Sequence, residues 1–370
     1  MSRSARQREE QAGQLLWIGF EGTGYHAPLE RLIRKIRPGG IILFSRNIDT
    51  ERQLRGLTDA LHRAVTVPPF IALDQEGGRV NRLKPFLGPT PSSQWLAHQT
   101  RPAEAVRTHA TAMVLALKTL GFNLNFAPVL DLSGPNPRNG IGDRAFDDDP
   151  RRVAELGAVS IRTHLRGGIL PVGKHFPGLG FSRADTHLTL PVIRRSRNLL
   201  LRNDLLPYRR LKSILPIVMV GHAYYPAVQG RPPAPATLSS RVVGGLLRKQ
   251  IGYRGLILTD DLEMGALDQT ADPARQALEA FTAGSDGLMF CRSEEKILTA
   301  WEGLIRSLES GAIPAARWRQ SQRRILALKR RALLSRRRSR YSRGTLARAR
   351  LLIESLEGPS AGGFDPTARA

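Results

Sequence analysis

The sequence predicts an α/β chain folded as a single (β/α)₈ barrel, the TIM barrel, with a basic C-terminal extension. Eight short apolar runs punctuate it, and most lack the polar alternation of a half-solvated sheet. Segments of helical composition lie between most of them. Five runs end in a polar or ionisable residue, as strands do at the mouth of such a barrel. No Gly-x-Gly-x-x-Gly follows the first run, which disfavours an open doubly wound sheet.

The expected strands and helices alternate along the chain. The strands cover residues 15–20, 40–44, 70–74, 124–131, 169–175, 217–222, 256–260 and 287–291. Helical composition is clearest over residues 51–65, 103–120, 151–166, 199–215, 241–250 and 272–283. Strand followed by helix, repeated within about 300 residues, favours the closed barrel.

We assign residues 1–334 to the barrel domain and residues 335–370 to a basic, partly disordered tail. Helical patterns over 296–307 and 314–334 would close the domain, the second with a solvated, arginine-rich outer face. Residues 345–356 have the composition of one more helix. The Gly, Pro, Ser and Ala content of 358–370 predicts disorder.

Composition indicates a globular protein, since 41% of the 370 residues are hydrophobic. The formal net charge is +24. Fourteen Lys and Arg residues lie between positions 317 and 350, a range without Asp or Glu. Because the excess charge is concentrated near the C-terminus and not spread over a binding face, we do not expect a nucleic-acid partner.

The sequence also predicts the compartment. A single cysteine, Cys291, excludes a disulfide framework and a cysteine-rich metal site. The N-terminal residues are polar, and no apolar run approaches the roughly 20 residues of a membrane span. We therefore expect a cytoplasmic protein without a signal peptide or a membrane span.

The most informative stretch runs from Lys174 to His187. An apolar run, residues 168–173, delivers Lys174 and His175 to the end of an expected strand, and a Pro-Gly pair then opens a loop. The loop carries His187 two residues after Asp185. A carboxylate near an imidazole can hold its tautomer and raise its basicity, which suits general acid–base catalysis. Such Asp-x-His pairs also recur by chance on surfaces, but this one follows a strand-terminal Lys-His pair.

A second stretch follows the expected strand 70–74. It carries Asp74 at the strand end, a Gly-Gly turn, and then Arg79 and Arg82. A carboxylate at a barrel mouth can accept hydrogen bonds from vicinal sugar hydroxyls, and a nearby guanidinium can bind an anionic or carbonyl group. The alternative is an Asp–Arg ion pair that stabilises the turn, and these residues alone do not separate the two.

Arg144 lies in a loop rich in Pro, Gly and Asn that follows the run ending at Asp131. The loop would place the guanidinium above the barrel mouth. The alternative is an ion pair in solvent with Asp143 or Asp147.

Asp260 ends the expected strand 256–260 and is a candidate nucleophile, electrostatic stabiliser or metal ligand. The metal role is poorly supported, because the chain has no His-x-x-x-His, no Glu-x-x-His and no cysteine cluster. A strand-end carboxylate that attacks, with a loop imidazole that moves protons, suits a retaining glycoside hydrolase. The usual version uses two carboxyl groups, and here Asp185 and His187 would replace the second.

Five motifs occur together and in order along the chain. They are 74–80 (Asp-Gln-Glu-Gly-Gly-Arg-Val), 125–131 (Asn-Phe-Ala-Pro-Val-Leu-Asp), 142–146 (Gly-Asp-Arg-Ala-Phe), 174–178 (Lys-His-Phe-Pro-Gly) and 259–264 (Thr-Asp-Asp-Leu-Glu-Met). In these motifs the chain resembles bacterial β-N-acetylglucosaminidases of glycoside hydrolase family 3, of the single-domain type of peptidoglycan recycling. The resemblance runs from residue 39 to residue 329, most of the chain.

The resemblance implies a TIM barrel that removes terminal β-linked N-acetylglucosamine with retention and without a cofactor or metal. It makes Asp260 the nucleophile and His187 the acid/base, oriented by Asp185. It implies a cell-wall substrate, N-acetylglucosamine joined to anhydro-N-acetylmuramic acid, as a saccharide or a muropeptide. The residues that it implies for sugar binding are Asp74, Arg82, Arg144, Lys174 and His175.

Two features depart from the family pattern. The family usually has a histidine after Pro-Gly in the loop, where this chain has Leu179, and the arginine-rich segment after Leu334 is not part of the pattern. Two other functions are compatible with the fold: hydrolysis of another β-glycoside such as a glucoside, and a weakly active barrel that binds polyanions through its tail. The Asp185–His187 pair disfavours the first, because the resembling glucosidases use a distant carboxylic acid. The presence of Asp260 together with Asp185 and His187 disfavours the weakly active, polyanion-binding barrel.

Overall fold

The structure, a computed structural model, describes residues 3–136, 140–182, 188–334 and 339–356. Its centre is a closed barrel of eight parallel strands in the order β1-β10-β9-β8-β7-β6-β3-β2. The predicted (β/α)₈ barrel is therefore confirmed. The strands are β1 (Leu16–Ile18), β2 (Gly40–Leu43), β3 (Phe70–Leu73), β6 (Leu124–Asn125), β7 (Leu170–Phe176), β8 (Ile217–Val220), β9 (Leu256–Asp261) and β10 (Gly287–Phe290).

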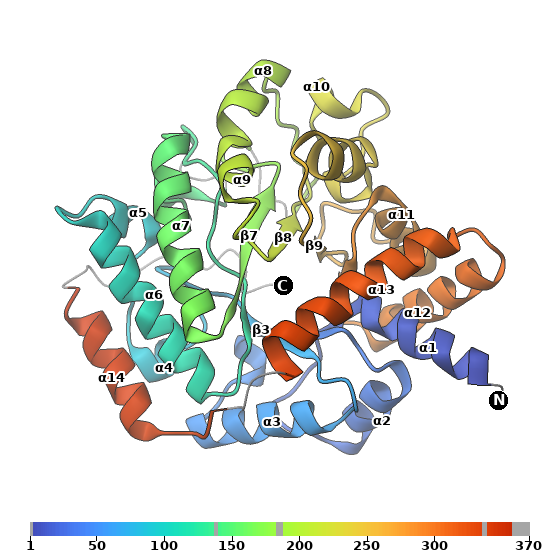
Figure 1. The fold of residues 1–370 in the computed structure, drawn as a ribbon, viewed down its shortest axis with the longest axis horizontal. Coiled ribbons are helices and arrows are strands. Elements are labelled where there is room, and N and C mark those ends of the chain that lie inside the picture. The colour runs from blue at the N-terminus through green and yellow to red at the C-terminus, as the bar shows by residue number, and fades with distance from the viewer. Residues whose placement is uncertain (1–2, 137–139, 183–187, 335–338, 357–370) are drawn as a thin grey trace.

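Helices form a ring around the strands (Figure 1). Those of the wall are α2 (Ala27–Ile36), α3 (Glu51–Arg63), α6 (Pro102–Thr119), α7 (Pro150–Gly167), α9 (Leu206–Leu211), α11 (Pro273–Ala283) and α12 (Glu294–Glu309). The expected helix over 199–215 is divided, since π-type turns over Leu200–Asp204 separate α8 (Arg197–Leu199) from α9, and Arg241–Gln250 is a π-type helix. None of the helices in the described part of the chain has the length and hydropathy of a membrane span.

Local sequence sets where β7, which carries Lys174 and His175, begins. The preceding helix α7 starts with Pro150 after Asp149, whose side chain accepts a hydrogen bond from the Arg151 N–H. The helix ends at Gly168, whose φ of 86° is left-handed and is open to glycine because it has no Cβ. The chain then passes directly into β7.

The barrel interior is filled by an aromatic stack at the level of β1. Trp17 of β1 lies parallel to Phe70 of β3, with ring centroids 5.2 Å apart. The strands beside β1 carry Gly40 and Gly287 at this level, where an added Cβ would lie within 2.6 Å of the Trp17 side chain. These glycines therefore make room for a large side chain inside a narrow barrel.

The inner face of α13 (Ala315–Lys329) carries charge as well as apolar groups. The sequence predicts a face made of Ile325, Leu326 and Leu328, but the structure buries Ile325 and Lys329 and leaves the other two partly exposed. The Lys329 ammonium donates to Gln14 Oε1 at 2.7 Å. Burial lowers the pKa of Lys329 to about 7.

Two arginines of α13 also turn inward. Arg317 and Arg324 bind the fully buried carboxylate of Asp286 through Nη1–Oδ1 contacts of 3.3 and 3.0 Å, and Arg248 binds its other oxygen. The basic run near the C-terminus is thus not only a solvated surface, because part of its charge holds α13 to the barrel.

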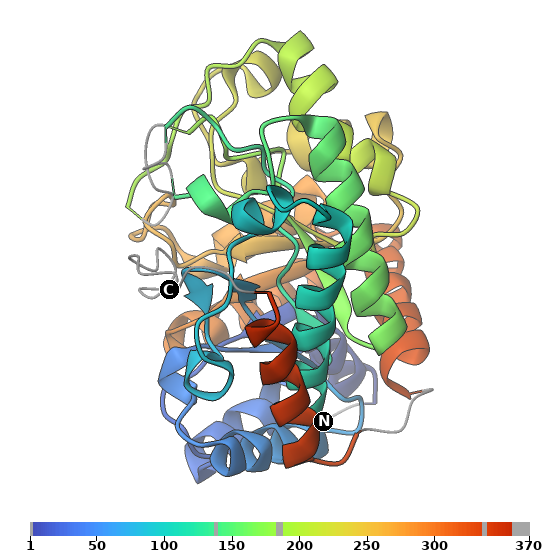
Figure 2. The same ribbon diagram turned by 90° about the vertical axis from the view of Figure 1, so that its left-hand side faces the viewer.

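Helix α14 (Arg343–Glu354) packs on the outside of the barrel, beside α6 and α4 (Lys84–Leu87) (Figures 1 and 2). Leu346, Ala349 and Ile353 are buried, and the Arg350 guanidinium donates to the Phe86 carbonyl at 2.6 Å. The proposed division at residue 334 therefore falls ahead of a helix that covers part of the barrel wall.

Candidate active site

Four barrel strands bring ionisable residues to one end of the molecule. Asp74 follows β3 and Asp131 lies beyond β6. Lys174 and His175 lie near the end of β7, and Asp260 lies near the end of β9. Because all eight strands are parallel, their C-terminal ends meet at the same mouth. In barrels of this kind the active site lies at that end.

A buried ion cluster occupies this mouth, made of Asp74, Glu76, Arg144 and Lys174. The Lys174 ammonium lies 2.5 Å from Asp74 Oδ1 and 2.6 Å from Glu76 Oε1. The Arg144 guanidinium binds the same Glu76 carboxylate in a bidentate pair, with both N–O distances 2.8 Å. One glutamate therefore joins the two cations that the sequence predicts as sugar-binding residues.

Pairing outweighs burial in setting the charges of this cluster. Burial alone would raise the pKa of Glu76, but the charges of Arg144 and Lys174 lower it. Burial alone would lower the pKa of Lys174, but Asp74 and Glu76 raise it, and Glu76 likewise raises the pKa of Arg144. A ligand at the mouth thus meets fixed, oriented charges at neutral pH.

The structure decides the alternative that was open for Arg144. Its side chain is buried and paired with Glu76, whereas Asp143 pairs with Arg79 (Nε–Oδ1 2.9 Å) and Asp147 pairs with Arg152. The interpretation of Arg144 as a solvent-exposed pair with a neighbouring aspartate is therefore wrong. Asp74, in turn, pairs with Lys174 across the mouth.

His175 is held by the buried carboxylate of Asp131. Its Nδ1 lies 2.7 Å from Asp131 Oδ2, so Nδ1 carries the proton. The backbone N–H of Leu179 donates to Asp131 Oδ1 at 2.7 Å. Since this contact uses the backbone, it does not require the histidine that the family usually has at position 179. The Leu179 side chain is buried in the apolar core beside the mouth.

Asp260 is partly exposed, and one carboxylate oxygen accepts a hydrogen bond from the Asp261 N–H at 2.9 Å. The Asp261 side chain is buried, and burial together with the charges of Glu263 and Asp260 raises its pKa to about 7. The two adjacent aspartates therefore differ in environment, and only Asp260 is partly open to a ligand.

Of the remaining predicted site residues, the structure describes Arg82 but not Asp185 or His187. Arg82 is 3% exposed and lies just beyond β5 (Val80–Asn81), which pairs with β4 (Gln75–Gly77). Asp185 and His187 lie outside the described residues, so their roles stay predictions.

The sequence motifs do not by themselves assign a role to Glu76. In an extended chain, side chains two residues apart point to the same side, so the spacing from Asp74 to Glu76 is the signal that places both at the mouth. Asp131 ends one of the predicted strands, but its partner on β7 is 44 residues away and no local pattern predicts that contact.

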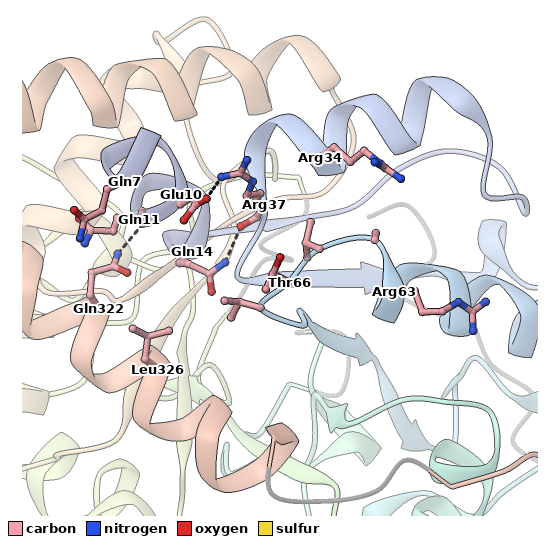
Figure 3. A pocket seen from close by; sticks show the side chains of 13 residues that line it. Gln7, Glu10, Gln11, Gln14, Arg34, Arg37, Arg63, Thr66, Gln322 and Leu326 are labelled. Carbon is pink, nitrogen blue, oxygen red and sulfur yellow. Dashed lines mark hydrogen bonds and ion pairs between the residues drawn. The ribbon is translucent and has the colours of Figure 1, made fainter. Parts of the chain in front are cut away.

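A cavity of about 630 Å³ lies at the opposite end of the barrel, between α1 (Arg3–Leu15), α2, α13 and the loop before β3 (Figure 3). Its polar lining includes Gln14 and the ion pair of Glu10 with Arg37. It contains none of the predicted site residues. Strand direction, not the size of this cavity, therefore locates the candidate active site.

Among the described residues, no group of three or more His, Cys, Asp or Glu side chains is arranged to hold a metal ion. The groups described at the mouth are paired carboxylates, two cations and an oriented imidazole.

The chain matches a known protein family over most of its length. Residues 8–328 match the family model of the glycosyl hydrolase family 3 N-terminal domain. The chain belongs to glycosyl hydrolase family 3. It is therefore a glycosidase, and the prediction of family and enzyme class is confirmed.

Family 3 relatives are similar over most of the chain. A protein of Alkalilimnicola ehrlichii named beta-hexosaminidase is 40% identical over 288 residues, which are 76% of this chain and 82% of that one. A family 3 β-N-acetylglucosaminidase structure from Paenibacillus has a TM-score of 0.87 at 34% identity, covering 94% of this chain and 68% of that one. NagZ of Neisseria gonorrhoeae, solved with N-trifluoroacetyl-D-glucosamine, has a TM-score of 0.73 at 29% identity, covering 94% and 98%.

Proposed function

We propose that this family 3 glycosidase removes terminal β-linked N-acetylglucosamine with retention, using Asp260 as nucleophile and His187, oriented by Asp185, as acid/base. The observation that carries the proposal is the buried ion cluster at the mouth where Asp260 also lies. The names of the relatives support the sugar, and the resemblance in the five motifs supports the catalytic roles.

The ion cluster supplies the sugar-binding groups. The Asp74 carboxylate, 13% exposed, would accept hydrogen bonds from sugar hydroxyls. Lys174 has three N–H donors, of which two bind Asp74 and Glu76, and the third would donate to a sugar oxygen. Arg144, Arg82 and His175 would add donors around the same ring. These groups hold the anomeric carbon in place for attack.

The reaction would proceed in two displacements. The Asp260 carboxylate attacks the anomeric carbon as the bond to the leaving oxygen breaks, and His187 gives that oxygen a proton. Water then attacks the same carbon, His187 takes the proton of that water, and the Asp260 carboxylate is released. Two inversions give net retention.

For the natural substrate we propose N-acetylglucosamine joined to anhydro-N-acetylmuramic acid, as a saccharide or a muropeptide, degraded in the cytoplasm. This rests on the resemblance to the peptidoglycan-recycling type. The test is release of N-acetylglucosamine from the purified disaccharide, and a kcat/KM no better than that with N-acetylglucosamine β-linked to a second N-acetylglucosamine would contradict the assignment.

The sugar specificity is tested with a chromogenic N-acetyl-β-glucosaminide set against the matching β-glucoside. We expect turnover of the first only, whereas preference for the glucoside would favour the alternative of a different β-glycosidase. Labelling with a slow fluorinated substrate and peptide mapping should locate the glycosyl ester on Asp260. A label on Asp261 or Glu263 would show that the nucleophile is assigned wrongly.

The acid/base role is tested with a series of leaving groups. His187→Ala should lose most activity on poor leaving groups, which need protonation, and less on activated aryl groups. Equal losses across the series would count against His187.

A further inference from the structure

His222 is a strand-end residue that the proposed reaction does not use. It lies two residues after the end of β8, and its side chain is fully buried. Its Nδ1 lies 2.7 Å from the Thr237 hydroxyl, and its Nε2 lies 2.8 Å from the backbone carbonyl of Asp261 on β9. The ring thus links the ends of two neighbouring strands of the mouth.

The partners of the ring assign its proton. A carbonyl oxygen only accepts, so Nε2 carries the proton and donates to the Asp261 carbonyl. In the neutral ring Nδ1 is then an acceptor, and the Thr237 hydroxyl donates to it. The Asp261 carbonyl therefore fixes the tautomer of His222, and Thr237 fixes the orientation of the ring.

The residue that His222 holds is itself bound to Asp260. The Asp261 N–H donates to Asp260 Oδ1 at 2.9 Å, and the Asp261 carbonyl also accepts from the Met264 N–H at 3.1 Å. The contacts form a continuous path from Thr237 through His222 and the Asp261 backbone to the carboxylate.

We propose that His222, held by Thr237, is a positioning residue for the nucleophile Asp260. By fixing the backbone of Asp261 it keeps an N–H aimed at the carboxylate that attacks the sugar. This inference rests on the proposed function. A hydrogen bond to the charged form favours ionisation, and a fixed oxygen stays aligned for attack.

The competing explanation is that His222 only satisfies buried polar groups and so stabilises the fold. Four variants separate the two. His222→Leu removes the donor, and His222→Gln keeps an N–H near the position of Nε2. Thr237→Val removes the hydroxyl that orients the ring, and Thr237→Ser keeps it.

A matched control is available in α3. Thr58 is also fully buried, and its hydroxyl donates to the Leu120 carbonyl at 2.8 Å, away from the mouth. Thr58→Val loses a buried hydroxyl bond as Thr237→Val does, so a general loss of stability affects both variants.

Two readouts are measured on folded protein: the rate at which a slow fluorinated substrate labels Asp260, and the pH profile of kcat/KM. We expect His222→Leu and Thr237→Val to slow labelling by roughly 10- to 100-fold, since small misplacements of reacting groups cost about that much. The acidic limb should move to higher pH, because a carboxylate that loses a donor ionises less readily. His222→Gln and Thr237→Ser should restore most of the labelling rate and most of the position of the acidic limb. Thr58→Val should change neither the labelling rate nor the acidic limb.

The inference is overturned if Asp260 is labelled but folded His222→Leu and Thr237→Val label at the wild-type rate with an unmoved acidic limb. If His222→Leu does not fold, Thr237→Val, which removes only a hydroxyl, provides the test of the inference. Should the label fall elsewhere or Asp260→Asn keep its activity, the proposed nucleophile fails instead, and that result is separate from the behaviour of the His222 variants.

Discussion

At the scale of single residues, Glu76 balances two buried cations with one carboxylate. Glu76→Gln would leave Arg144 without its bidentate partner and should destabilise the fold by roughly 3–5 kcal/mol, as loss of one member of a buried pair does. Asp143→Asn is the control, because it removes the partner of Arg79 where the acid is 39% exposed, and about 0–1 kcal/mol is expected. Denaturant unfolding measures both, and equal costs would contradict a buried, mutually dependent cluster.

Lys174 belongs to the same scale, and its effect should appear in catalysis. If its third donor binds the sugar, Lys174→Ala should cost roughly 2–4 kcal/mol of transition-state stabilisation. Lys212→Ala is a control for loss of a lysine outside the mouth, since exposed Lys212 donates only to the Ile251 carbonyl among the contacts described. An unchanged kcat/KM in folded Lys174→Ala would exclude the sugar-binding role.

At the scale of elements, α14 is held to the barrel by apolar side chains. Leu346 is 2% exposed and Leu351 of the same helix is 64% exposed. Leu346→Ala should therefore cost about 2–5 kcal/mol and Leu351→Ala about 0.5 kcal/mol or less. Thermal unfolding measures both, with glycosidase activity unchanged at 25 °C. Equal, small effects would mean that α14 adds little to the stability of the barrel.

Lys329 makes the attachment of α13 depend on pH. Burial lowers its pKa to about 7, while an unfolded lysine titrates near 10.4. Between these values the unfolded chain binds more protons, so this residue makes stability rise with pH, by up to about 1.4 kcal/mol per pH unit. Lys329→Met should remove that rise. A slope from pH 7.5 to 9.5 that is the same in wild type and variant would show that Lys329 is not responsible.

At the scale of the whole molecule, the charge of +24 is partly used inside the fold. Arg317 and Arg324 bind Asp286, and Arg350 binds the Phe86 carbonyl. We expect the exposed remainder of the basic run to be solvated surface, without steeply salt-dependent binding of duplex DNA.

The measurement is a binding isotherm at low and physiological salt for the full chain and for a variant with Arg319, Arg323 and Arg330 changed to Gln, all three exposed on or just after α13. Binding that is tight at low salt, falls steeply with salt and is lost in the variant would contradict the expectation and favour a polyanion partner.

Strand and helix positions followed from the sequence because they depend on local patterns. All eight apolar runs became barrel strands, and Asp74, Lys174, His175 and Asp260 lie at the mouth because parallel strands share one end. The roles of Asp185 and His187 stay predictions, since they fall outside the described residues.

Only the tertiary structure decided which charges meet. Arg144 is adjacent in sequence to Asp143 but pairs with Glu76, 68 residues away, because closure of the barrel brings the loop beyond β6 over β4. Lys329 belongs to a helix whose arginine-rich outer face the sequence predicts to be solvated. It is nevertheless buried, because α13 lies against Gln14 of α1. Ion pairing depends on distances in space and on exclusion of water, and neither is encoded by the spacing of residues along the chain.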